Sequence, residues 1–134
     1  DITNMKIAKK TKSPVLLITD IEKGGAFASI VGTMELIEKK YVELVKGFII
    51  NKFRGDIEML KPGYRKLKQK TGIPVFGTIP MTEFKIPDED SIGNSPKNLN
   101  WNASNLKKLD IEINKIAKVV KSSLNIPKVE KLLK

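Results

Sequence analysis

Three short apolar runs, the first two of which end in polar residues, divide the first part of the chain. They occupy residues 15–20, 47–52 and 75–79 and are rich in Val, Ile, Leu and Phe. Runs of this length with little alternation are typical of strands buried on both faces of a parallel sheet. Between them, apolar residues recur at spacings of three and four, which is the pattern of an amphipathic helix. The alternation predicts an α/β fold, a parallel sheet with flanking helices.

Local signals set the ends of the predicted helices. An apolar stripe over residues 27–37 predicts a helix after the first strand, and Lys-rich amphipathic helices are expected at 38–46 and 61–70. Pro62 suits the first helical position, and Gly72 suits the position just past the end of the helix.

The pattern changes after residue 80. The acidic run at 88–90 is interpreted as a solvated turn in preference to a divalent-cation site, and the Asn- and Ser-rich residues 94–105 as a linker. A helical stripe then runs over 104–121, and Pro127 opens a last short helix. The predicted organisation is an α/β part at 1–93, a linker at 94–105 and a helical tail at 106–134.

Composition excludes several kinds of chemistry. At 134 residues the chain is one domain of ordinary size, and it contains no Cys and no His. A thiolate nucleophile, a disulfide framework and the commonest general base are therefore absent, and no catalytic residue is predicted. No apolar run reaches the roughly 18 residues of a membrane span, and no leader pattern is visible. The sequence therefore predicts a cytoplasmic protein without membrane contact, and its first residue, Asp1, predicts a fragment or a processed product.

The net charge of +10 raises the question of nucleic-acid binding. The cations are 23 Lys and only two Arg, Arg54 and Arg65, and the lysines are spread over several predicted helices. Base readout and bidentate phosphate binding favour Arg. The charge is therefore interpreted as Lys-rich solvated helix faces, and a nucleic-acid partner is not expected.

The second apolar run ends in the motif Asn51-Lys52-Phe53-Arg54-Gly55-Asp56. In open α/β sheets, ligands bind beyond the carboxyl ends of the strands. An Asn side chain has both a donor and an acceptor, so Asn51 can match the N6/N7 edge of adenine. Lys52 either stacks its stem over a base or braces the loop. Asp56 is interpreted as the N-cap of a short turn at 57–60.

A second motif, Asp20-Ile21-Glu22-Lys23-Gly24-Gly25, follows the first apolar run. An acid at a strand end followed by glycines that open a helix can bind Mg²⁺ or phosphate. The alternative is a tight turn with Asp20 solvated, and the motif leaves both open. The P-loop pattern G-x-x-x-x-G-K-[ST] occurs nowhere in the chain.

Taken in order, these motifs resemble cobyric acid synthases, the glutamine-dependent amidotransferases of cobalamin biosynthesis. The resemblance covers residues 1 to about 93 and implies the fold of a dethiobiotin synthetase-like, P-loop ATP-binding domain. It rests on the segments at 1–5 (DITNM), 20–29 (DIEKGGAFAS), 47–56 (GFIINKFRGD), 71–77 (TGIPVFG) and 87–93 (PDEDSIG).

The resemblance implies ATP and Mg²⁺ as cofactors, without assigning metal ligands. It places Asn51, Lys52 and Pro80 at the nucleotide. It places a second group near the corrin substrate and the phosphates: Asp20, Lys23, Gly24, Gly25 and Arg54. Lys23 stands where the family usually has Arg, which keeps the charge but loses bidentate contact.

The family's P-loop strand would precede Asp1, and its glutaminase, with a Cys and a His, would follow residue 93. The resemblance therefore implies the C-terminal half of the ATP-binding domain joined to the family's helical tail. Its substrates would be adenosylcobyrinic acid a,c-diamide and glutamine-derived ammonia. We expect no catalysis by this chain alone, and a partner chain or second copy completing the sheet beside residues 15–20. The alternatives are a ParA-like module that binds nucleotide or nucleic acid without catalysis, and a remnant without a ligand.

Overall fold

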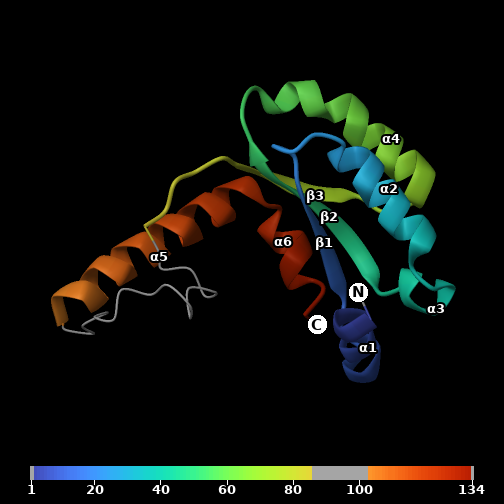
Figure 1. Cartoon of the computed structure of the whole chain (residues 1–134), viewed down its shortest axis with the longest axis horizontal. Coiled ribbons are helices and arrows are strands. Elements are labelled where there is room, and N and C mark those ends of the chain that lie inside the picture. The colour runs from blue at the N-terminus through green and yellow to red at the C-terminus, as the bar shows by residue number, and fades with distance from the viewer. Residues whose placement is uncertain (1, 86–102, 134) are drawn as a thin grey trace.

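The computed structural model describes residues 2–85 and 103–133 (Figure 1). The predicted linker falls largely outside the described residues, as do the motif at 87–93 and the acidic run within it. The elements, in chain order, are α1 (Ile2–Thr11), β1 (Val15–Asp20), α2 (Ala26–Leu36), α3 (Lys39–Val42), β2 (Val45–Phe53), the 3₁₀ turn η1 (Ile57–Leu60), α4 (Lys61–Thr71), β3 (Val75–Pro80), α5 (Ala103–Ser123) and α6 (Ile126–Glu130).

The three strands form a parallel sheet in the order β1-β2-β3, which confirms the predicted α/β class. The central strand β2 is buried on both faces over residues 47–50, as its apolar run predicted. The prediction of a helix over 38–46 is correct for one turn, α3, and wrong from residue 43 onwards. The backbone N–H of Val15 already donates to the carbonyl of Leu44 at 2.8 Å. Pairing with β1 therefore ends α3 at Val42 and begins β2 at Val45.

Helices α2 and α4 cover one face of the sheet (Figure 1). Phe48 and Ile50 of β2 point to this face and are fully buried against Ile30 of α2 and Leu67 of α4. Side chains two apart on a strand share a face, which explains why this pair, and not Ile49 between them, belongs to the cluster. This core fixes α2 and α4 relative to the carboxyl ends of the strands.

The C-terminal helices lie on the other side of the sheet from α2 and α4 (Figure 1). They are attached to β3 by backbone contacts. Gly77 and Leu124 form an isolated antiparallel bridge. The N–H of Asn125 donates to the carbonyl of Phe76 at 2.8 Å, and the Asn125 side chain caps α6 by accepting from the N–H of Lys128. Two helices were predicted here, and two are present.

Strand β1 lies at an edge of the sheet, as expected, because within the described ranges its only strand partner is β2. All six of its residues keep some solvent exposure, and Ile18 is 57% exposed. Helix α1, which the sequence did not predict, precedes it. An open parallel edge of this kind leaves N–H and C=O groups facing solvent.

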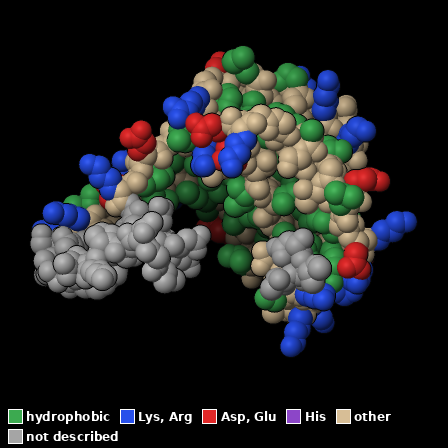
Figure 2. Space-filling model, in the orientation of Figure 1, with side chains coloured by type: hydrophobic (Ala, Val, Ile, Leu, Met, Phe, Trp, Pro, Cys, Tyr) green, Lys and Arg blue, Asp and Glu red, His purple; other side chains and the backbone are tan. Residues whose placement is uncertain are grey.

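On the face shown in Figure 2, Lys and Arg side chains lie at several separate places and do not form one continuous basic patch. This distribution agrees with the interpretation of the +10 charge as solvated helix faces. Over residues 2–85 and 103–133, every helix is too short or too polar to cross a membrane.

Candidate functional site

The carboxyl ends of the three strands meet at one edge of the sheet. Asp20, the last residue of β1, is the register partner of Asn51 on β2. Two residues further along β2, Phe53 is the partner of Pro80, the last residue of β3, and the N–H of Met81 donates to the carbonyl of Phe53 at 2.9 Å. The parallel register therefore brings together the candidate residues Asp20, Asn51 and Pro80, which lie far apart in the sequence.

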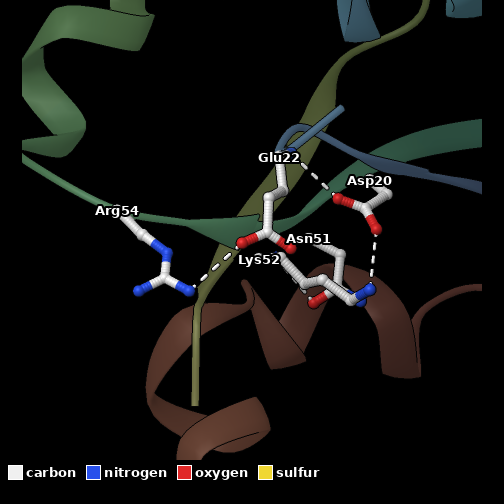
Figure 3. A network of polar contacts seen from close by, with 5 residues as sticks. All are labelled: Asp20, Glu22, Asn51, Lys52 and Arg54. Carbon is white, nitrogen blue, oxygen red and sulfur yellow. Dashed lines mark hydrogen bonds and ion pairs between the residues drawn. The ribbon is translucent and has the colours of Figure 1, made fainter. Parts of the chain in front are cut away.

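Two ion pairs join the last residue of β1 and the turn after it to the end of β2 and the residue that follows (Figure 3). Lys52 Nζ lies 2.7 Å from Asp20 Oδ2, and Arg54 Nη2 lies 3.1 Å from Glu22 Oε1. Lys52 in β2 and Arg54 just after it thus both have carboxylate partners. Glu22 was not among the predicted site residues. The signal for it is its place two residues beyond a strand end, opposite a motif with two cations.

Asn51 and Lys52 adopt an unusual local geometry. Lys52 has φ 60°, although it belongs to a strand. Its backbone N–H donates to Asn51 Oδ1 at 2.9 Å. Residues other than Gly rarely adopt a positive φ, and where they do, neighbouring contacts usually hold them there. These contacts suit a Lys52 that braces the loop, one of the two roles that the sequence left open.

The turn between β1 and α2 depends on two glycines. Gly24 has φ 74° and Gly25 has φ 67°, and a Cβ on either would meet no heavy atom within 4 Å. The need for Gly is therefore conformational, and the space beside the turn is open. Asp20 Oδ1 accepts the N–H of Glu22 at 2.9 Å, which fixes the start of the turn. Gly25 offers no side-chain oxygen to the first N–H groups of α2.

The remaining candidates differ in their surroundings. Lys23 is exposed in the turn after β1, and Pro80 is exposed at the end of β3. Asp56 lies outside the cluster's ion pairs. Its Oδ1 accepts the N–H of Glu58 at 2.9 Å, which confirms its predicted role as the N-cap of η1.

The edge offers groups that suit a nucleotide. The Asn51 amide can bind a base edge, and the open Gly24-Gly25 turn at the start of α2 can approach phosphates. For Mg²⁺ the fit is poor, because Asp20 and Glu22 are both paired with cations. No group of three acids suited to a metal ion occurs in the part of the chain that the structure describes.

The Asp20–Lys52 pair shifts both titrations in the directions expected of partners. The hydrogen bond from Lys52 lowers the pKa of Asp20 below its ordinary value of 3.8, and the N–H of Glu22 lowers it further. The same hydrogen bond raises the pKa of Lys52 above 10.5. Both charged forms are therefore favoured in the folded protein across the neutral range.

This pair predicts how Asp20→Asn changes the pH dependence of stability. A depressed carboxyl pKa contributes stability that is present above the unfolded value and is lost as pH falls through the folded one. Wild type is therefore expected to exceed Asp20→Asn in free energy of unfolding from pH 5 to 9. The difference should shrink as pH falls below 3.8 and disappear once pH has passed the lowered pKa of folded Asp20. Urea titrations over this pH series measure it, and a constant difference down to pH 2 contradicts the assignment.

Most of the chain is similar to known proteins. Residues 1–85 match a family model described as an AAA domain. A protein named probable cobyric acid synthase from Thermococcus kodakarensis is 53% identical over 97 residues, which are 72% of this chain and 20% of that protein. The cobyric acid synthase of Desulfitobacterium hafniense strain DSM 10664 is 54% identical over 93 residues, 69% of this chain and 18% of that protein.

A third alignment covers more of the chain. The probable cobyric acid synthase of Methanosarcina barkeri is 44% identical over 119 residues, which are 89% of this chain and 24% of that protein. The chain thus spans about a fifth of the length of the relatives it matches. No solved structure matches it.

Proposed function

Because the chain belongs to the AAA domain family and its relatives include cobyric acid synthases, we propose that it supplies part of the nucleotide site of such an enzyme. One observation carries the proposal. The parallel register gathers Asp20, Asn51 and Pro80 at the carboxyl edge of the sheet, where α/β folds bind ligands. In this proposal residues 1–93 form half of an ATP-binding domain, 94–105 a linker and 106–134 a helical tail.

Each candidate residue has a distinct role in the proposal. The amide of Asn51 binds the N6/N7 edge of adenine, and Pro80 contributes apolar surface beside the base. The Gly24-Gly25 turn and the start of α2 face the phosphates, where their N–H groups and partial positive charge favour an anion. Lys23, exposed in the same turn, adds charge to this part of the site.

The proposed reaction is the ATP-driven amidation of corrin carboxylates. A carboxylate oxygen of the substrate attacks the γ-phosphorus of ATP, and ADP leaves. Ammonia released from glutamine then attacks the acyl phosphate carbon, and phosphate leaves as the amide forms. The P-loop that binds the β- and γ-phosphates has no counterpart in this sequence, nor do the Cys and His expected of the glutaminase. The chain's proposed contribution is therefore nucleotide binding.

Base discrimination tests the proposal. Inosine carries an acceptor where adenosine carries the N6 donor, so ITP cannot satisfy both groups of Asn51. We expect wild type to bind ATP about tenfold more tightly than ITP, and Asn51→Ala to remove the preference. Calorimetric titration with each nucleotide measures both affinities.

Asn114→Ala is the matched control, because this Asn is exposed on α5, outside the strand-end cluster. Equal affinity of wild type for ATP and ITP overturns the assignment of Asn51. A salt-sensitive shift of duplex DNA without a nucleotide preference supports the ParA-like alternative instead.

A further inference from the structure

The backbone of Lys52 identifies a second residue that determines how Asn51 is presented. Among the described residues, two that are not Gly have positive φ, Lys12 at 55° and Lys52 at 60°. Lys12 directly follows α1, and helix ends commonly adopt this conformation. Lys52 lies inside β2, where the ladder favours extended backbone. The local conformation must therefore be imposed by specific contacts.

Three contacts surround this position, and two of them join residues that Figure 3 labels. The N–H of Lys52 donates to Asn51 Oδ1 at 2.9 Å. Lys52 Nζ reaches across to Asp20 Oδ2 at 2.7 Å, so the side chain is anchored on the neighbouring strand. The N–H of Ile21 donates to the carbonyl of Asn51 at 3.0 Å, which ties the same peptide to the chain after β1. The peptide between Asn51 and Lys52 is thus anchored to the segment that ends β1.

These contacts fix the side-chain amide of Asn51. One lone pair of its Oδ1 accepts the N–H of Lys52, which fixes the plane of the amide and leaves the second lone pair of Oδ1 and the Nδ2 group for the N6 donor and N7 acceptor of adenine. Without the Asp20–Lys52 pair, Lys52 can relax to an extended φ, and its N–H then leaves Asn51 Oδ1. The amide of Asn51 would then sample several rotamers, and any ligand would have to order it on binding.

We propose that Lys52 is a positioning residue: anchored by Asp20, it holds the Asn51 amide in the orientation that binds the base, without touching the ligand itself. This inference rests on the proposed function. The positioning role differs from stacking of the Lys52 stem over the base, because here Lys52 acts through its ammonium group, which is bound to Asp20. Arg at this position can make the same bond to a carboxylate, whereas Met keeps the stem but loses the bond.

A ligand-free measurement tests the geometry. We expect the N–H of Lys52 to exchange slowly with solvent in wild type, and its protection to fall about tenfold in Asp20→Ala. Asp20→Ala leaves residue 52 unchanged, so the same N–H is compared. Protection of the N–H of Ile50, which lies in the core of β2, reports whether the fold is intact. Unchanged protection of the Lys52 N–H in Asp20→Ala overturns the proposal, whether or not nucleotide binds.

The ratio of ATP to ITP affinity tests the consequence, because contacts to the triphosphate cancel in it. Lys52→Met and Asp20→Ala are each expected to lower the ratio about tenfold, and Lys52→Arg to retain it. The double variant should be no worse than either single one, because the two residues act through one bond. Lys46→Met, an exposed change on the same strand, is the control.

The outcomes separate the two hypotheses. A preference for ATP in wild type that survives Lys52→Met overturns the positioning role but not the proposed function. Additive losses in the double variant also overturn it, because they indicate a direct contact of Lys52 with the ligand. If wild type shows no preference for ATP, the proposed function and the positioning of Asn51 for a base both fail.

Discussion

Gly77→Ala is expected to release the C-terminal helices from the sheet and to lower the free energy of unfolding by about 3 kcal/mol. A Cβ at this position would overlap the carbonyl oxygen of Ser123 and lie 2.9 Å from Leu124 Cα. Both are backbone atoms, so no side-chain rotation can make room. The bridge between Gly77 and Leu124 must therefore open.

Two measurements test the effect of Gly77→Ala. Urea unfolding gives the loss of stability, and hydrogen exchange at Asn125 reports the release, because its N–H donates to the carbonyl of Phe76 at 2.8 Å in wild type. Gly32→Ala is the control. This Gly lies within α2 with no heavy atom within 4 Å of a Cβ, so Ala should stabilise the helix by about 0.5–1 kcal/mol. Wild-type stability and exchange in Gly77→Ala would contradict the docking of the tail on β3.

Phe48→Ala is expected to cost about 3–5 kcal/mol, because it opens a cavity in the centre of the molecule. The ring is fully buried and packs in the cluster that joins β2 to α2 and α4. A domain of this size is typically stable by only about 5–15 kcal/mol, so the variant should be close to unfolding at 37 °C.

Denaturation by urea measures the loss in Phe48→Ala. Leu36→Ala is the matched control, since Leu36 is 87% exposed at the end of α2 and should change stability by less than about 0.5 kcal/mol. A loss below about 1 kcal/mol for Phe48→Ala would show that β2 is not the centre of the core.

The apolar runs were sufficient to predict the sheet, because buried parallel strands have a distinctive composition. The helix signals at Pro62 and Gly72 also agree with the structure, where α4 starts at Lys61 and Gly72 follows its last residue with φ 73°. The sequence failed at 38–46. There the spacing of the lysines is that of a helix face. Val45 instead pairs with Val15, thirty residues away, and this strand pairing outweighs the local helix preference.

The residues of the site could be nominated from the sequence, but their contacts could not. Strand ends identify Asp20 and Asn51, because ligand sites cluster there. The ion pairs with Lys52 and with Glu22 depend on the register between β1 and β2, which only the structure gives. The positive φ of Lys52 was also invisible, because nothing in a Lys residue signals that conformation.

Nucleotide binding can be mapped most directly on the backbone N–H signals of the ¹⁵N-labelled chain. We expect ATP to shift signals at the ends of β1, β2 and β3 and in the Gly24-Gly25 turn and to leave α5 unchanged, and we expect ITP to give weaker shifts. Shifts confined to the Lys-rich surfaces of α4 and α5, or equal shifts with both nucleotides, would contradict a base-binding site at the carboxyl edge of the sheet.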